Sequence, residues 1–260
     1  MEQRATFNTI ADLYGSARPG YPDALVGDII AFAALSPGDA VLEVGCGAGQ
    51  ATAGFAKRGY RITALDPGAE LIRVARDRLA GAADVDFIVS TFESWQAPRD
   101  AFRLVFAAQS WHWIDPGIGF AKAADALTEG GVLGVFGHVP RNPPEPLRTA
   151  LEQVWRHHTG KWEPPPETAY LPGGPFVQLF DKSGLFEPVA HTGYAWIWHL
   201  TSQGYAHFMR TRSDHQLMKP EDREPLLTNA KAAVDALGGE FDWPFETHLY
   251  LARKSGRPHR

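Results

Sequence analysis

The chain contains one cysteine among 260 residues, and this scarcity restricts its chemistry. A single cysteine cannot form an intramolecular disulfide, and Cys46 has no basic neighbour in sequence to activate its thiol. We therefore expect Cys46 to be a small residue selected for fit. The ten histidines lack the spacing of four that pairs ligands on one helical face, so we predict no metal site.

Long apolar runs and concentrations of positive charge are also absent from the sequence. No stretch approaches the roughly 20 apolar residues of a membrane span, and the first residues lack the apolar core of a signal peptide. The formal net charge is −5, and the lysines and arginines are scattered. Nucleic-acid binding requires a basic surface, so we expect no nucleic-acid partner. Because long apolar segments are absent, we expect a cytoplasmic protein with no membrane partner. The sequence leaves the oligomeric state open.

The most informative segment runs from Ala40 to Asp66. Val41–Val44 is a short apolar run that ends at three alternating glycines, and small apolar residues follow at helical spacing. This pattern predicts a strand, a glycine loop and a helix. Glycines allow a ligand to approach main-chain N–H groups, and the helix presents its positive end. A second strand ends at Asp66, at the sheet edge where a carboxylate can bind a ribose diol.

The spacing Gly45, Gly47, Gly49 is GxGxG, whereas a dinucleotide loop is GxGxxG and needs a small residue where Gln50 stands. With Glu43 the motif is ExGxGxG. It resembles the first motif of the class I S-adenosylmethionine (SAM)-dependent methyltransferases, and Asp66 resembles the second. The segments ADLYGSARPGYP, QSWHWID and FETHLYLARK resemble the small-molecule (type 11) branch. No motif is recognised from Pro140 to Glu187.

Hydrophobic periodicity and turn residues predict alternating helices and strands. Expected helices are Pro22–Ala33, Gln50–Lys57, Ala69–Leu79, Phe120–Leu127, Leu147–His157, Ser202–Arg210 and Glu221–Leu237. Expected strands are Ala40–Val44, Arg61–Leu65, Val85–Val89, Leu104–Ala108, Val132–Phe136, Val189–Leu200 and Thr247–Ala252. These elements predict an α/β fold, a doubly wound Rossmann-like sheet. The resemblance implies seven strands in the order 3-2-1-4-5-7-6, the last strand antiparallel.

We expect one methyltransferase domain over residues 1–260 with four parts. These are an N-terminal lid and helix (1–36), a SAM-binding core (37–138), a proline-rich helical cap inserted after the fifth strand (139–187), and hairpin strands and helices (188–260).

The resemblance implies SAM as cofactor and assigns positions around it. Tyr14 and Tyr21 would flank SAM, with Arg18 on its carboxylate. Thr91 and Phe92 would contact the adenine, and Gln109–Trp113 would lie beside the methyl group. The expected cofactor-binding residues are Tyr14, Arg18, Tyr21, Glu43, Gly45, Cys46, Gly47, Gly49, Asp66, Pro67, Thr91, Phe92, Gln109, Ser110 and Trp111. Several have structural alternatives: Glu43 as an acceptor for loop N–H groups, Asp66 as a helix cap, and Phe92 as a core residue.

The predicted function is methyl transfer to a small-molecule acceptor by in-line displacement. If the acceptor must lose a proton, His112 is the candidate catalytic base, although it could instead pack between Trp111 and Trp113. Candidate substrate residues are Trp113, His138, Trp196 and Trp198, the last two of which could equally be packing residues. Two alternatives stay open: a nicotinamide-dependent oxidoreductase, and a non-catalytic SAM-binding protein.

Overall fold

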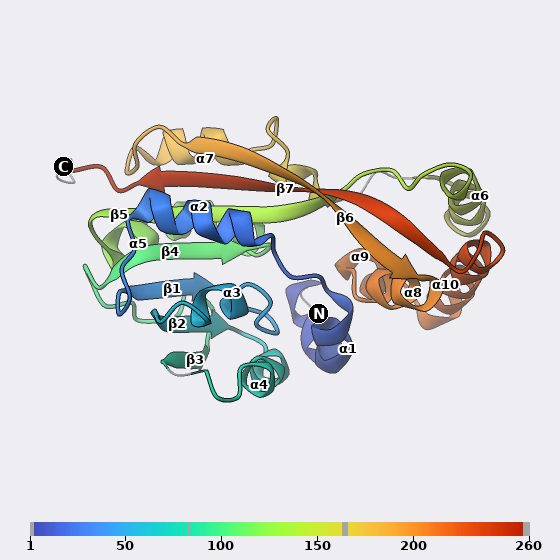
Figure 1. Ribbon diagram of the computed structural model, residues 1–260, viewed down its shortest axis with the longest axis horizontal. Helices are drawn as coiled ribbons and strands as arrows, with labels where there is room; N and C mark the ends of the chain where they lie inside the picture. Colours follow the sequence, from blue (N-terminus) through green and yellow to red (C-terminus); the bar gives the residue numbers. More distant parts are fainter. Residues whose placement is uncertain (1–2, 83, 163–165, 257–260) are drawn as a thin grey trace.

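A seven-stranded sheet forms the centre of the molecule (Figure 1). The computed structural model describes residues 3–82, 84–162 and 166–256. The strands are β1 (Ala40–Val44), β2 (Arg61–Asp66), β3 (Val85–Val89), β4 (Phe102–Ala108), β5 (Leu127–Pro140), β6 (Ala190–Thr201) and β7 (Glu240–Arg253). Their order is β3-β2-β1-β4-β5-β7-β6, and β7 is antiparallel to both of its neighbours. The predicted fold class and strand order are confirmed.

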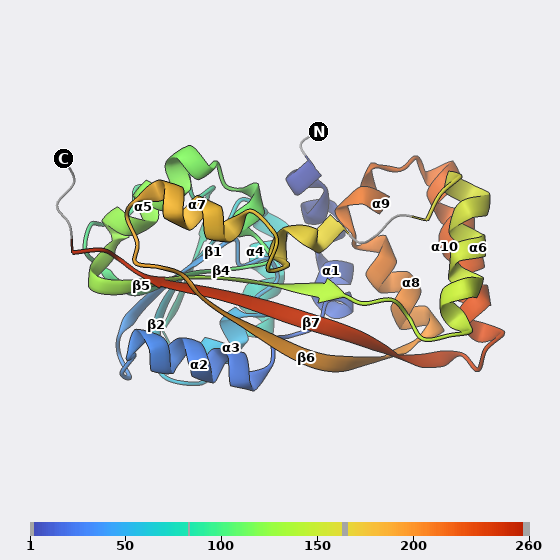
Figure 2. The ribbon, with the colours of Figure 1, turned by 90° about the horizontal axis from the view of Figure 1, so that it is seen from above.

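Helices cover both faces of the sheet, as Figure 2 shows. On one face α2 (Asp23–Ala33), α3 (Thr52–Ala56) and α4 (Ala69–Arg78) pack around Val41, Ile62 and Phe106. On the other, α5 (Pro116–Ala126) and α7 (Phe176–Ser183) cover Leu42, Val105 and Leu133. Because both faces are buried, the central strands are continuous apolar runs.

Six of the seven expected helices differ from the structure at one or both ends, mostly by one or two residues. Helix α5 begins at Pro116, four residues before the expected Phe120, because the Asp115 side chain caps it by accepting from the Gly117 N–H at 2.8 Å. Helix α3 spans only Thr52–Ala56, because the chain between the glycine loop and Ala51 forms turns. The short 3-10 helix η2 (Trp111–Trp113) and helices α7 and α9 (Ser213–Leu217) were not predicted.

Strands β6 and β7 extend beyond the sheet and carry a second group of helices, which we call the helical end (Figure 1). It comprises α6 (Leu147–Thr159), α8 (Ser202–Arg210), α9 and α10 (Pro220–Asp235). Its core includes Leu151, Phe208, Leu227 and Trp243. Strand β7 begins seven residues before the expected Thr247, because Glu240–Glu246 pair with β6, and Glu240–Pro244 do so beyond the end of β5.

The described residues of 139–187, expected as one cap insertion, lie in two places, and residues 163–165 of that insertion lie outside the described residues. Helix α6 joins the helical end and packs against α10. The 3-10 helix η3 (Pro166–Tyr170) and α7 return to the sheet, where Tyr170, Phe176 and Phe180 join its core.

The N-terminal segment, expected as a lid with no secondary structure assigned before Pro22, forms helices η1 (Gln3–Ile10) and α1 (Ala11–Ala17). Helix α1 packs against α4 and α8, between the sheet and the helical end (Figure 2). In the described part of the chain, no helix is both long enough and apolar enough to span a bilayer.

Candidate functional site

The glycine loop follows β1 at the carboxyl edge of the parallel strands. The N–H groups of Gly45 and Cys46 both donate to the Leu65 carbonyl at 2.8 Å, which folds the loop against β2. Gly45 has a φ of +72°, and a Cβ on it would lie 2.5 Å from that of Ser110. Glycine is therefore required at this position both by backbone conformation and by space.

Asp66 ties the loop to the start of α4. Its Oδ2 accepts from the Gly47 N–H at 2.9 Å, and its Oδ1 accepts from the Gly68 N–H at 2.8 Å. The residue is 7% exposed, and burial raises the pKa of its carboxyl to about 6 despite these hydrogen bonds. Each carboxyl oxygen keeps a second lone pair for a ligand hydroxyl.

Glu43 is fully buried at the end of β1. Its Oε2 accepts from the Thr52 hydroxyl at 2.6 Å, whereas its Oε1 has no hydrogen-bond partner among the described residues. Burial, with the nearby Asp66 carboxyl, raises the pKa of Glu43 to about 8. The partner that β1 places beside Glu43 is thus a hydroxyl on α3, and not the loop N–H groups proposed as the structural alternative.

These residues open onto a cavity, the cofactor cavity, between the sheet edge, the N-terminal segment and the helical end. Most of the expected site residues line it: Tyr14, Arg18, Tyr21, Glu43, Gly45, Cys46, Gly47, Asp66, Pro67, Thr91, Phe92, Gln109, Ser110, Trp113 and His138. They come from six separate segments, which the strand order brings to one edge.

The structure does not bring five of the expected residues to the cofactor cavity. Gly49 faces α4, where a Cβ would lie 3.3 Å from that of Ala75. Trp111 is 3% exposed and packs edge-on against Phe120.

Trp196 and Trp198 pack against Phe245 beside the helical end, and the Trp196 indole donates to the Thr247 hydroxyl at 2.9 Å. These are the packing positions that an alternating strand offers. His112 lines a neighbouring cavity.

Several lining residues were not predicted. Ser90 and Glu93 flank the predicted Thr91 and Phe92, so their position after β3 was a usable signal. Phe208 on α8 and Phe245 on β7 also line the cavity, but no local pattern marks them because only the long hairpin carries them there.

Arg18 joins the N-terminal segment to the helical end. Its Nε donates to the Thr211 hydroxyl at 2.9 Å and its Nη2 to the Thr211 carbonyl at 2.7 Å. The guanidinium lies 5.0 Å from the centre of the Tyr14 ring and 4.9 Å from that of Phe208. No carboxylate of the described residues forms an ion pair with Arg18, so its positive charge at the cavity wall is stabilised by two π faces and by the hydroxyl and carbonyl of Thr211.

His138, on β5, is engaged at both ring nitrogens. Its Nε2 lies 3.1 Å from the Gly20 carbonyl, which can only accept, so Nε2 carries the proton. Its Nδ1 then accepts from the Thr247 hydroxyl at 2.7 Å, while the ring stacks on Tyr21 at 4.3 Å. Burial lowers the pKa of His138 to about 3, so the ring is neutral. His138 therefore links the N-terminal segment, through Gly20, to Thr247 on β7.

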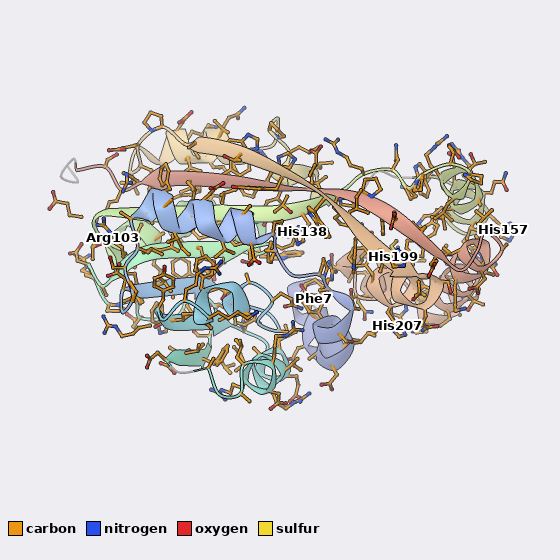
Figure 3. All side chains as sticks on the ribbon, viewed as in Figure 1. Phe7, Arg103, His138, His157, His199 and His207 are labelled. Carbon is orange, nitrogen blue, oxygen red and sulfur yellow. The ribbon has the colours of Figure 1, made fainter. Side chains whose placement is uncertain are left out.

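Figure 3 shows His157, His199 and His207 at the helical end, away from His138. No group of three His, Cys, Asp or Glu residues in the described ranges could hold a metal ion.

The neighbouring cavity, which we call the inner cavity, adjoins the cofactor cavity and has a volume of about 250 Å³. The two cavities share Phe7, Tyr14, Arg18, Gln109 and Trp113. In the inner cavity the Nδ1 of His112 lies 3.0 Å from the Tyr170 hydroxyl. Desolvation by the surrounding protein lowers the pKa of His112 to about 4, so the ring is neutral and can accept a proton.

Comparison with known proteins identifies the class of this fold and site. A family model described as a methyltransferase domain matches residues 41–131, which include the glycine loop and Asp66. A ubiquinone biosynthesis O-methyltransferase from Xanthomonas campestris is 30% identical over 174 residues, 62% of this chain and 72% of that protein. A trans-aconitate 2-methyltransferase from Rhizobium etli is 32% identical over 161 residues, 61% of this chain and 54% of that protein.

A solved structure of a proposed type II methyltransferase from Anaeromyxobacter dehalogenans has the same fold, with a TM-score of 0.63 and 21% identity. The match covers 93% of this chain and 99% of that one. The chain belongs to the class I SAM-dependent methyltransferases, and its cofactor is SAM. It spans about half the length of several curated relatives that it matches.

The residues present fit this cofactor. A Cβ at Gly45 would collide with Ser110, so this position has to be glycine, which leaves the loop backbone accessible to a ligand. Asp66 offers free lone pairs at the edge of the sheet. The sequence analysis left a nicotinamide-dependent oxidoreductase open as an alternative. The match to the methyltransferase family argues against it.

Proposed function

We propose that this protein transfers the methyl group of SAM to a small-molecule acceptor held in the inner cavity. The observation that carries the proposal is the shared wall: five residues line both the cofactor cavity and the inner cavity. A molecule in the inner cavity would therefore lie next to a molecule in the cofactor cavity. An in-line displacement requires this adjacency.

The cofactor supplies an electrophilic methyl group on a positively charged sulfur. Tyr14 and Trp113 stand in the shared wall, and their ring faces can stabilise a nearby cation by about 0.5 to 2 kcal/mol. The rings also keep water away from the reacting atoms. In this proposal Asp66 and the glycine loop orient the ribose and amino-acid parts, and Thr91 and Phe92 border the base.

His112 is the proposed base where the acceptor must lose a proton. Its Nδ1 is paired with Tyr170, so Nε2 is the nitrogen that can face an acceptor. This arrangement requires the proton to rest on Nδ1 and the Tyr170 oxygen to accept it. His138 is not suited to this role because both of its ring nitrogens are hydrogen-bonded to protein.

We propose that the acceptor is a small molecule and not a polynucleotide. The net charge of −5 offers no basic surface, and two relatives are named for trans-aconitate and for ubiquinone biosynthesis. Arg18 lies in the shared wall without a carboxylate partner among the described residues, which favours an acceptor with an anionic group nearby.

Calorimetric titration with SAM, its demethylated product S-adenosylhomocysteine and NAD tests the cofactor side. We expect micromolar affinity for the first two, about −8 kcal/mol, and no binding of NAD. Release of S-adenosylhomocysteine is then measured with a panel of small acids and phenols, with His112→Gln as a comparison.

Turnover of one acceptor class, reduced in the variant, would support the proposal. Tight cofactor binding without turnover across the panel would favour the remaining alternative, a non-catalytic SAM-binding protein.

A further inference from the structure

A third cavity lies within the helical end, away from the glycine loop. We call it the outer cavity; its volume is about 500 Å³, and its walls come from α6, α8, α9 and β7. Six lining residues carry the argument: Trp155, Trp162, Tyr205, Arg212, His215 and Trp243. Three indole rings and a cavity of this size suit a planar apolar group, since cavities of about 150 Å³ already admit benzene.

Tyr205 brings a buried polar atom to the wall of this cavity. The residue is 2% exposed, and its ring packs against Trp243 with centroids 5.4 Å apart. Its hydroxyl has no hydrogen-bond partner among the described residues, and the oxygen is not completely shielded from solvent. The hydroxyl therefore faces the cavity. A buried hydroxyl without a partner costs stability unless a ligand or water satisfies it.

His215 supplies a complementary atom on the same wall. It is 5% exposed, and its Nδ1 lies 2.7 Å from the Met209 carbonyl. Because a carbonyl only accepts, Nδ1 carries the proton and Nε2 carries a lone pair. No described residue donates to Nε2. The outer cavity is thus lined by one buried hydroxyl that can donate and one ring nitrogen that can accept, and a ligand hydroxyl can bond with either of them.

The outer cavity and the inner cavity are neighbours, because one ion pair lines both. Arg212 is 5% exposed and its Nη2 lies 3.2 Å from the Asp214 Oδ2, and both residues line both cavities. Because Asp214 balances the charge of Arg212, the boundary between the inner and outer cavities does not require an anion. A molecule long enough to pass this pair would have one end beside the cofactor cavity and the other among the tryptophans.

We propose that the outer cavity binds a planar aromatic group that bears a hydroxyl, and that this group is the distal part of the methyl acceptor. The placement of the acceptor rests on the proposed function, whereas the ligand chemistry rests on the cavity alone. The acceptor would thus be elongated, with its reactive atom at His112 and its aromatic end between Tyr205 and His215.

The test uses 2-naphthol as probe and naphthalene as the matched ligand without a hydroxyl, each titrated calorimetrically into the full chain with and without S-adenosylhomocysteine. We expect 2-naphthol to bind several-fold more tightly than naphthalene, and to bind the S-adenosylhomocysteine complex at least as well as the free protein. Tyr205→Phe removes only the unpartnered hydroxyl and should reduce 2-naphthol affinity roughly 2- to 10-fold while leaving naphthalene unchanged.

A cavity-filling pair locates the site. Met218→Trp places a bulky ring at the cavity wall and should abolish probe binding. Leu217→Trp makes the same change at a neighbour that is 55% exposed and does not line the cavity, so it should bind like the wild type.

Equal loss in both variants, no binding of 2-naphthol, or competition between 2-naphthol and S-adenosylhomocysteine would overturn the inference. Failure of S-adenosylhomocysteine to bind would instead count against the proposed function, so the two failures are distinguishable.

Discussion

The buried carboxyl of Glu43 should make the stability of this protein fall with increasing pH. Burial raises its pKa from 4.5 to about 8, so the folded state holds a proton that the unfolded chain releases near pH 4.5. The folded state is therefore penalised progressively between about pH 4.5 and pH 8, and the penalty is complete above pH 8. Glu43→Gln removes the titration but keeps the shape and an oxygen for the Thr52 hydroxyl.

The size of this effect follows from the raised pKa. Each pKa unit corresponds to about 1.4 kcal/mol, so the full penalty is at most about 5 kcal/mol, and relaxation around the ionised group should reduce it to about 2 to 5 kcal/mol. We expect Glu43→Gln and wild type to have similar unfolding free energies at pH 5. At pH 8.5 the variant should be more stable by this amount.

Urea unfolding of the cofactor-free protein from pH 5 to pH 9 measures the difference. Glu129→Gln, which removes an exposed carboxylate, is the matched control and should follow the wild-type curve. Parallel curves for Glu43→Gln and wild type, or a variant that is less stable at pH 8.5, would refute the assignment of the slope to Glu43.

Three further outcomes are expected. Asp66→Ala should weaken SAM binding by about 1 to 3 kcal/mol in calorimetry, whereas Asp77→Ala, an exposed carboxylate on α4, should not; equal affinities would mean that Asp66 only braces the loop. Gly45→Ala should lose SAM binding, because both its φ and its space are restricted. Gly38→Ala, with a φ of +86° and nothing within 4 Å, should cost about 1 kcal/mol of stability and still bind SAM, and similar behaviour of the two would show that loop geometry is not critical. Arg18→Lys should speed proteolysis near the N-terminal segment, because a lysine cannot make both hydrogen bonds to Thr211 at the end of α8. SAM should slow cleavage of the wild type, and mass spectrometry measures both rates. Identical rates in every case would show that this segment does not cover the cofactor.

Much of the fold could be predicted because local signals agree with the tertiary structure. Strands β1 and β3 and helix α8 match their expected boundaries, since buried parallel strands are uninterrupted apolar runs and the glycine loop is a strong boundary. The N-terminal helices and α7 could not be predicted in the same way. Their packing partners lie on α4, α8 and the far face of the sheet, which local periodicity does not reveal.

The amino-acid sequence by itself determined the glycine loop and the acid after β2, because these depend on backbone conformation and on patterns within single segments. The order of the sheet followed from the resemblance to the family, and the structure confirmed it. Only the tertiary structure decided the use of each side chain. In the folded protein the side chain of Trp111 is buried in the core, and both ring nitrogens of His138 are hydrogen-bonded to protein. The fold also brings Phe208 and Phe245 to the cofactor cavity. It also formed the outer cavity, whose walls come from residues 140 to 243. Side-chain direction, burial and the choice of hydrogen-bond partner depend on residues distant in the chain, and no local pattern encodes them.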